Sequence, residues 1–317
     1  MSKFDLSRRQ FMGFAGGVAA VAGLGLVGCG STGTDSTGEG GDSAETATLT
    51  GSISCSGATS FQPLIEAASD AFCEANPDVS IAISAGGSGQ GLSQVAEGSV
   101  QIGRSDVYAE SKLEPEQCEN LVDNQVCIVG MGPIVNADVD VDDISLEQLK
   151  GIFMGEITDW SDLGGTAGAI QVIQREAGSG TRATFEDAVL QGDTAPDSFR
   201  PVAEVDSSGT VVEQVAQTPG SISYVAFNYM NSDGIKALTV EGVEPTQENV
   251  ESGDFTIWAY EHMYTRSDED ASTAPVTQAF IEFIMSDDFA DTVVEQGFIP
   301  MGDMQVKKDA DGNITAA

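Results

Sequence analysis

The chain has 317 residues, with 50 Asp or Glu against 13 Lys or Arg, so its formal net charge is −37. This acidity argues against binding of nucleic acid, or of anionic lipid through charge. Any bound anion must therefore be held by local geometry, because the global field repels it. The length exceeds one average domain and suits two lobes.

The first residues predict an export signal. Paired Arg8 and Arg9 precede a Gly- and Ala-rich apolar run that ends in Leu26-Val27-Gly28-Cys29. The paired arginines resemble a twin-arginine signal, and the last four residues match a bacterial lipobox. We expect residues 1–28 to be cleaved and Cys29 to carry lipid on its thiol and amino group. A transmembrane helix is the alternative, but the apolar run is short and rich in glycine.

A spacer is expected next, because Gly30 to Thr46 contains Gly, Ser, Thr and acidic residues with only Ala44 among them. Such a stretch has no apolar face to bury. Residues 29–47 are therefore interpreted as a lipid anchor and flexible linker. They would hold an extracytoplasmic protein at a membrane, on the cell surface or the periplasmic face.

Four further cysteines follow the lipobox: Cys55, Cys73, Cys118 and Cys127. An even number permits disulfides in an exported protein, but spacing does not fix the pairing. The four do not form two close-spaced pairs, and His262 is the only histidine. We therefore expect no metal site.

Glycine-rich turns join strands to helices in the first half of the chain. The run from Thr48 to Ser54 alternates as a strand, and Thr59 and Ser60 lie in the junction after it. A second strand, residues 79–83, leads into a glycine-rich turn that holds Ser88. As isolated hydroxyls these residues would be helix caps. The turns lack the Walker pattern and the full dinucleotide fingerprint.

A third strand, Val100 to Gly103, ends at Asp106. An acid at a strand end is more often a cap or salt-bridge partner. Near an anion site, however, it can accept a hydrogen bond from a protonated oxyanion and repel an oxyanion without a proton. The repeated strand–turn–helix units predict an α/β lobe whose ligands bind at the carboxyl ends of its strands.

A second lobe is expected where the apolar run Val126 to Gly132 ends at Pro133. A helix capped by Ser145 follows, and a later helix begins in the stretch from Asp206 to Thr210. The strand-like run Phe255 to Tyr264 would return to the first lobe. The predicted lobes are residues 48–133 with 256–317, and residues 134–255.

The stretch from Arg175 to Arg182 contains two glycines between a strand and a helix. The free N–H groups of the new helix and its dipole can receive a small anion. Ser179 and Thr181 add hydroxyl donors, and Arg175 adds a charged fork suited to a tetrahedral oxyanion. Taken alone, this run is also typical of an ordinary helix N-cap.

With these residues together, the chain resembles the phosphate-binding lipoproteins of bacterial ABC uptake systems, from about Thr48 to Pro300. The most specific matches are Gly57–Phe61, Gly87–Gly89, Ser105–Asp106, Leu149–Gly164 and Arg175–Thr181. The resemblance implies a two-lobed α/β periplasmic-binding-protein fold of type II, with the ligand in the interdomain cleft. It also implies capture of inorganic phosphate and delivery to permease subunits by lobe closure.

The resemblance further implies roles for single residues. Asp106 would accept the proton of hydrogen phosphate, Arg175 would supply the cationic contact, and Glu176 would orient that arginine. The remaining donors to the anion would be Thr59, Ser60, Ser88, Ser179, Gly180 and Thr181. Ser60 and Gln90 depart from the family's pattern, which leaves the contacts near them less defined.

Three alternatives remain open. A binding protein for molybdate, tungstate or sulfate would differ at Asp106, because such sites bind unprotonated anions mainly through neutral donors. A phosphatase or esterase would need a metal cluster or a nucleophile with a base. An adhesin would have no reason for converging glycine turns. We expect no enzyme, no cofactor and no nucleic-acid partner.

Overall fold

The computed structural model describes residues 48–309 and 312–317, and residues 50–317 form one compact unit. The predicted signal peptide, the lipidated Cys29 and the linker lie outside the described residues. Within the described ranges, no helix is both long and apolar enough to cross a membrane.

Most strands belong to one ten-stranded mixed sheet in the order β2-β1-β3-β11-β4-β8-β6-β7, with β9 and β12 also paired to β4. The strands are β1 (Gly51–Gly57), β2 (Val79–Ala85), β3 (Ile102–Ser105), β4 (Leu121–Asn136), β5 (Asp143–Ile144), β6 (Gln171–Arg175), β7 (Ala203–Val205), β8 (Ser221–Ala226), β9 (Ile235–Ala237), β10 (Thr239–Val240), β11 (Trp258–Arg266), β12 (Ile299–Pro300), β13 (Val306–Lys308) and β14 (Ile314–Ala316).

Along the chain, most helices connect one strand to the next. They are α2 (Gln62–Ala75), α3 (Gly87–Ala96), α4 (Pro115–Cys118), α5 (Leu146–Phe153), α6 (Gly180–Leu190), α7 (Ser208–Gln217), α8 (Gln247–Ser252), α9 (Ala274–Ile284) and α10 (Asp287–Glu295), with 3₁₀ turns η1 (Ala109–Ser111), η2 (Trp160–Leu163), η3 (Phe227–Tyr229) and η4 (Met301–Asp303). The expected cap of α5 is confirmed, because the Ser145 hydroxyl accepts from the Gln148 N–H in a capping box.

The pairing of the strands produces two lobes. On one side β1 is parallel to β2 and β3, and on the other β6 is parallel to β7 and β8. The long strands β4 and β11 join them, because the first part of β4 pairs with β11 and its second part with β8 and β9. The predicted two-lobed α/β fold is thereby confirmed.

Pro133 does not end its strand, so the expectation of a break there was wrong. It lies inside β4 opposite Tyr224 of β8. A proline removes one donor from a ladder but keeps its carbonyl, and this carbonyl accepts from the Leu238 N–H at 3.1 Å. The sheet therefore continues through the connection as far as Asn136.

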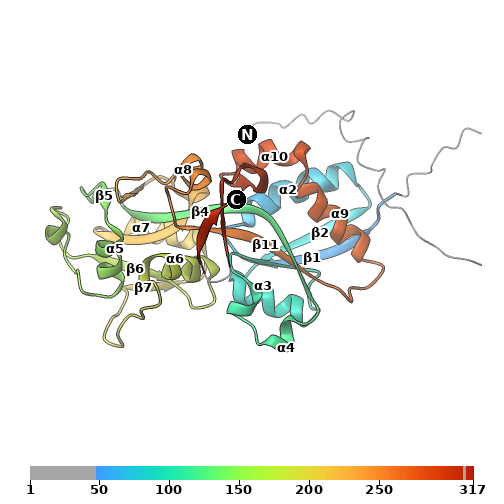
Figure 1. Cartoon of the computed structure of the whole chain (residues 1–317), viewed down its shortest axis with the longest axis horizontal. Helices are drawn as coiled ribbons and strands as arrows, with labels where there is room; N and C mark the ends of the chain where they lie inside the picture. Colours follow the sequence, from blue (N-terminus) through green and yellow to red (C-terminus); the bar gives the residue numbers. More distant parts are fainter. Residues whose placement is uncertain (1–47, 310–311) are drawn as a thin grey trace, which may run out of the picture. The chain divides into compact units, whose positions relative to one another are not determined.

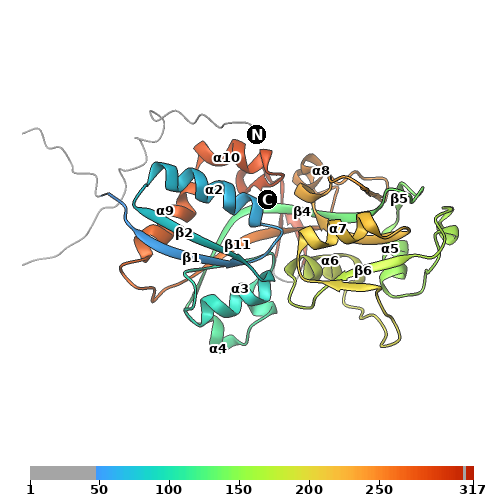
Figure 2. The ribbon, with the colours of Figure 1, turned by 180° about the vertical axis from the view of Figure 1, so that it is seen from behind.

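Helices cover both faces of the first lobe's sheet. Figures 1 and 2 show α2, α9 and α10 on one side of β1 and β2, and α3 on the other. Phe72 of α2 packs on Phe280 and Phe283 of α9, with ring centroids 5.4 and 5.6 Å apart. This aromatic contact fixes α2 and, with it, the loop at its N-terminus.

The second lobe has an aromatic centre. Phe185 of α6 stacks on Tyr224 of β8 at 4.0 Å and meets the ring of Phe153 edge-on at 4.8 Å. Trp160 is fully buried, and its Nε1 donates to the Gly220 carbonyl at 2.9 Å. These contacts fix α6 against the sheet, and α6 begins at the candidate site.

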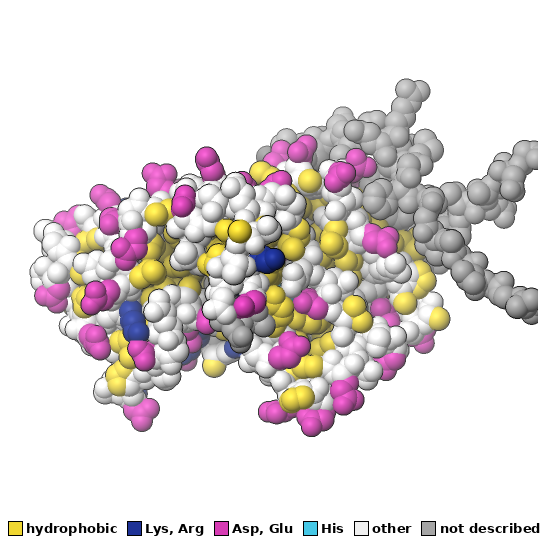
Figure 3. Space-filling model, in the orientation of Figure 1, with side chains coloured by type: hydrophobic (Ala, Val, Ile, Leu, Met, Phe, Trp, Pro, Cys, Tyr) yellow, Lys and Arg dark blue, Asp and Glu magenta, His cyan; other side chains and the backbone are white. Residues whose placement is uncertain are grey.

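Acidic side chains are spread over the face seen in Figure 3, where few Lys or Arg are visible. No large basic patch appears on that face. The view agrees with the net charge of −37.

Gly91 allows α3 to approach the sheet. A Cβ there would lie 2.7 Å from both Gly57 Cα and the Ser56 carbonyl, and 2.8 Å from the Arg104 carbonyl. Because these atoms are backbone, we expect Gly91→Ala to lower the free energy of unfolding by about 1–3 kcal/mol. Denaturant titration measures this change. The control is Gly209→Ala in α7, where a Cβ meets no heavy atom within 4 Å. An equal loss in both variants would contradict the packing argument.

Candidate functional site

Buried polar side chains gather where the parallel strands of the two lobes end. β1, β2 and β3 are parallel in the first lobe, and β6 and β7 are parallel in the second, but the two sets run in opposite directions through the sheet. Within each lobe the carboxyl ends of parallel strands lie at the same edge, so residues that follow them can meet. Those that follow β1, β2, β3, β6 and β7, or end β6, are at most 6% exposed: Thr59, Ser60, Ser88, Asp106, Arg175, Ser179, Thr181 and Ser208. All of these except Ser208 were predicted from the sequence.

Asp106 lies at the centre of this cluster and is 2% exposed. Its Oδ1 accepts from the Ser60 hydroxyl at 2.7 Å, and its Oδ2 accepts from the Thr181 hydroxyl at 2.8 Å. Its backbone N–H donates to Ser88 Oγ at 3.1 Å. Two hydroxyl donors therefore point at one buried carboxyl group. One donor follows β1 and the other begins α6, so the carboxylate bridges the two lobes.

Arg175 ends β6 and is 1% exposed. Its Nη2 donates to Thr59 Oγ1 at 3.2 Å and to the Asp206 carbonyl at 3.0 Å, and its Nη1 donates to Ser208 Oγ at 3.3 Å. Burial lowers the pKa of Arg175, which Tyr224 and Asp106 oppose. A guanidinium nevertheless stays charged in proteins. Its Nε has no partner among the described residues, so one donor remains for another acceptor.

The start of α6 supplies the second lobe's donors. Ser179 caps the helix, because its Oγ accepts from the Arg182 N–H at 3.1 Å. Gly180 lies so close to Ser88 that an added Cβ would be 2.1 Å from Ser88 Oγ. The Gly89 N–H donates to the Gly178 carbonyl at 3.0 Å. The helix that begins in one lobe therefore meets the helix that begins in the other.

Glu176 does not fill its expected place. Its side chain is exposed, and no ion pair joins it to Arg175 among the described residues. The chain leaves β6 at this residue, so its side chain faces solvent. The Arg175 backbone carbonyl instead accepts from Arg182 Nη1 at 2.7 Å. The guanidinium is held by the contacts described above, not by a neighbouring carboxylate.

Sequence reasoning missed Ser208, the first residue of α7. It is fully buried, and its N–H donates to Thr59 Oγ1 at 3.2 Å. A sequence pattern could have identified it, because Asp206 to Thr210 repeats the strand-to-helix pattern of the other site residues. Two further contacts have no such pattern in the nearby sequence. Tyr229 donates to the Thr59 carbonyl at 2.9 Å, and Asn228 donates to the Ser60 carbonyl at 3.1 Å.

The site contains no obvious place for a metal. Within the described part of the chain, no group of three or more His, Cys, Asp or Glu side chains could hold one. The four cysteines that left disulfide pairing open are free thiols: Cys55, Cys73, Cys118 and Cys127.

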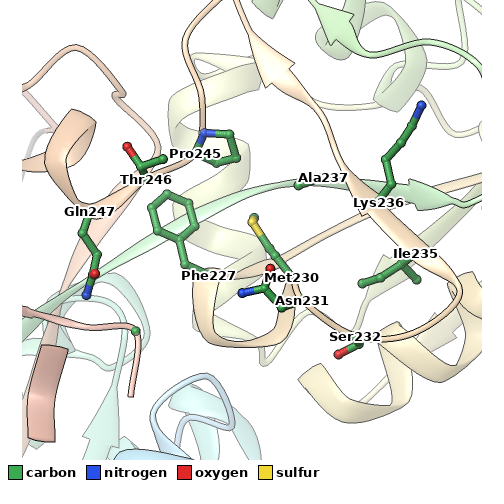
Figure 4. A pocket seen from close by; sticks show the side chains of 11 residues that line it. Phe227, Met230, Asn231, Ser232, Ile235, Lys236, Ala237, Pro245, Thr246 and Gln247 are labelled. Atoms are coloured by element: carbon green, nitrogen blue, oxygen red, sulfur yellow. The ribbon is translucent and has the colours of Figure 1, made fainter. Parts of the chain in front are cut away.

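A pocket of about 700 Å³ lies elsewhere, beside η3, β9 and the start of α8 (Figure 4). Phe227, Met230 and Pro245 give it an apolar wall, and Lys236 and Gln247 lie at its edges. None of the predicted anion-binding residues lines it. The candidate site is therefore the contact region of the strand ends, not this pocket.

The fold and the strand-end site define a two-lobed α/β binding protein of the periplasmic type. Residues 42–288 match the family model of the PBP superfamily domain. The phosphate-binding protein PstS of Bacillus subtilis is 45% identical over 264 residues, which cover 83% of this chain and 85% of that relative. The chain therefore belongs to the PBP superfamily and, within it, to the PstS family of phosphate-binding proteins.

Other relatives agree. PstS of Borreliella burgdorferi is 32% identical over 174 residues, covering 52% of this chain and 61% of that protein. A crystal structure of a phosphate ABC transporter substrate-binding protein from Clostridium perfringens, with bound phosphate, is 32% identical with a TM-score of 0.72. The match covers 79% of this chain and 100% of that chain. An ABC-type phosphate transport receptor from Vibrio cholerae is 26% identical with a TM-score of 0.62, over 78% of this chain and 99% of that one.

The hydrogen bond from Thr181 to Asp106 can be tested by stability. We expect Thr181→Val to lower the free energy of unfolding by about 1–3 kcal/mol, because a buried carboxylate loses a donor. The matched control is Thr184→Val, since Thr184 Oγ1 donates to the uncharged Asp106 carbonyl at 3.3 Å. Its expected loss is about 0.5–1.5 kcal/mol. Denaturant curves that give equal losses would contradict a special role for the carboxylate.

Proposed function

We propose that this protein captures inorganic phosphate outside the cytoplasm and delivers it to the permease of an ABC transporter. One observation carries the proposal. Asp106 is a buried carboxylate surrounded by hydroxyl groups, helix starts and an arginine from both lobes. A general anion site has no use for an acceptor of this kind. Its PstS relatives and the structural neighbours named above as phosphate transport proteins support the choice of ligand.

The anion would be held by donors on both sides. Thr59, Ser60 and Ser88 contribute from the first lobe, and the start of α6 (Ser179, Gly180 and Thr181) contributes from the second. Arg175 adds the positive charge, and its unpartnered Nε is a donor available to an anion oxygen. The hydroxyls of Ser60 and Thr181 can rotate, so the same groups can serve Asp106 and a ligand oxygen.

Selectivity follows from the count of donors and acceptors. An ionised Asp106 needs a donor from the ligand, and hydrogen phosphate carries one. Sulfate has no proton and would place a bare oxygen against a buried carboxylate. An unpaired contact of that kind costs on the order of several kcal/mol. This difference is large enough to separate two anions of the same shape.

Lobe closure would complete the site and signal its occupancy. The proposed lobes are residues 48–133 with 256–317, and residues 134–255, joined by β4 and β11. Each supplies only part of the donor set, so the anion is fully coordinated only when the lobes meet. The permease would recognise the closed form, and no bond of the ligand would be broken.

The proposed location follows from residues before the compact unit. A twin-arginine signal over residues 1–28 would export the chain, and lipid on Cys29 would anchor it. Residues 29–47 would then act as the flexible tether. Mass spectrometry of the membrane fraction tests this part separately, with Cys29→Ser expected to release the protein.

Calorimetric titration of the chain from residue 30 onward with phosphate, arsenate, sulfate and molybdate tests the function. We expect tight binding of phosphate and no comparable binding of sulfate or molybdate. Preference for molybdate or sulfate would favour the alternative oxyanion carrier. Failure to bind any of these anions would refute the proposal. Turnover of a phosphate ester by the purified protein would instead support an enzyme.

Asp106→Asn tests the proton-accepting role. The amide can donate to an unprotonated oxygen, so we expect the preference for phosphate over sulfate to fall by at least about tenfold, the equivalent of 1.4 kcal/mol. Competitive binding measures the ratio. An unchanged ratio would refute the role of Asp106.

Arg175→Lys tests the guanidinium fork. Lysine keeps the charge but cannot reach Thr59, Ser208 and the Asp206 carbonyl together. We expect the phosphate Kd to rise by about 10- to 100-fold, as for the loss of a hydrogen bond to a charged group. Arg266→Lys is the control, because Arg266 forms a surface pair with Asp268. Similar affinities for both variants would argue against the assigned contact.

A further inference from the structure

A second buried carboxyl group lies beside Asp106. In the antiparallel register of β11 and β3, His262 lies opposite Ser105. Glu261 precedes His262 and Asp106 follows Ser105, so the two residues lie at the same end of this ladder, where the register of β11 is irregular between Glu261 and His262. Glu261 is fully buried and lies opposite Cys127 of β4. Both carboxyl groups are therefore buried at the same end of the β3–β11 pair.

The two carboxyl groups differ in their hydrogen-bond donors. Both oxygens of Asp106 accept hydrogen bonds, whereas neither oxygen of Glu261 has a partner among the described residues. A carboxylate accepts at about four positions, so Asp106 has room for two more donors beyond Ser60 and Thr181. Two adjacent buried carboxyls do not both ionise readily. The proton therefore belongs on Glu261, which lacks donors.

Other charged and titratable groups around Glu261 do not reverse this assignment. Burial raises the pKa of Glu261 well above its usual range and Asp106 raises it further, whereas Arg104 and the Ser60 hydroxyl oppose the shift. The single Ser60 O–H, however, already donates to Asp106 Oδ1 at 2.7 Å. Arg104 forms no ion pair among the described residues, and its Nη2 donates to the Ser84 carbonyl at 2.6 Å. Its Nε and Nη1 have no hydrogen-bond partner among the described residues, so this positive charge lies near Glu261 without forming an ion pair with it.

Three further titratable groups near the site are neutral. Burial, reinforced by Glu261, raises the pKa of the Cys127 thiol well above its ordinary value. Burial raises the pKa of Cys55 to about 11 although Arg104 is near, and it raises the pKa of Tyr229 to about 12. None of these groups adds charge at neutral pH.

We propose, on the basis of the phosphate-binding function above, that Glu261 is a positioning residue: a neutral carboxylic acid whose hydroxyl donates to Asp106. This donation fills a third acceptor position of Asp106 and leaves the fourth for the proton of the ligand. The neutral acid also keeps a second negative charge away from the bound dianion. No proton is transferred, because Glu261 and the ligand each retain their own.

The proposal makes phosphate binding sensitive to alkaline pH. When Glu261 loses its proton, it can no longer donate to Asp106, and a new negative charge faces the anion site. The phosphate Kd then rises by up to about tenfold per pH unit, the limit for linkage to one proton. Above the second titration of phosphate the ligand itself does not change, so the effect there belongs to the protein.

The test compares Glu261→Gln with the natural chain. Glutamine has the shape of the neutral acid and keeps an N–H donor, so its phosphate Kd at neutral pH is expected within about twofold of the natural value. Infrared difference spectra should show a protonated carboxylic acid band in the natural chain that Glu261→Gln lacks. Absence of that band would show an ionised Glu261 and overturn the proposal. Glu282→Gln, an exposed substitution in α9, is the matched control and should keep the band.

Two further readouts separate donation from packing. Glu261→Leu lacks any donor, and its Kd is expected to be about 10- to 100-fold weaker than that of Glu261→Gln, the range for a hydrogen bond to a charged group. Along a pH series, the ratio of the natural Kd to that of Glu261→Gln should rise as the infrared band disappears. Glu261→Gln binding as weakly as Glu261→Leu, or a constant ratio while the band disappears, would overturn the proposal. If the natural chain binds no phosphate at neutral pH, the function fails while the band still reports the state of Glu261.

Discussion

The hydrogen bonds of Asp106 to hydroxyls from both lobes are the contacts on which the site depends. A buried carboxylate without donors would cost several kcal/mol. Ser60 and Thr181 remove that cost; Ser60 lies in the loop between β1 and α2 in one lobe, and Thr181 lies in the first turn of α6 in the other. The strand ends, the glycine turns and the close approach of Gly180 to Ser88 bring these donors to the carboxylate. Phosphate recognition depends on the same need of the carboxylate for donors, because Asp106 can accept a further hydrogen bond from a ligand that carries a proton.

An acidic protein can bind an anion because the relevant fields have different ranges. At physiological ionic strength the field of surface charges is screened over about 8 Å. Buried groups are screened much less, so the Arg175 guanidinium and the helix starts dominate within the site. The net charge of −37 then acts on solubility and encounter, while local donors decide affinity.

The sequence predicts where strands end better than it predicts which side chains come into contact. The strand–turn–helix units at Ser88 and Thr181, and the acid at Asp106, were recognisable because the pattern is local. Glu176 follows Arg175 in sequence, but its side chain is exposed, because neighbouring residues of a chain need not share a face. Pro133 was misjudged because a proline in a shared strand still offers its carbonyl to the ladder. Ser208 lies in a local strand-to-helix pattern that the sequence does show. Its contact with Thr59 was missed because it depends on the order of the strands in the sheet, which the sequence does not reveal.

Glu261 could not be recognised from the sequence. It lies in an aromatic run of β11 and looks there like a single polar residue in an otherwise buried strand. Only the antiparallel insertion of β11 beside β3 brings it to Asp106. A neutral acid costs far less to bury than a carboxylate, and it can donate where the ionised form could only repel. The strand that joins the lobes can therefore carry an acid into the core without cancelling the positive charge on which the anion site relies.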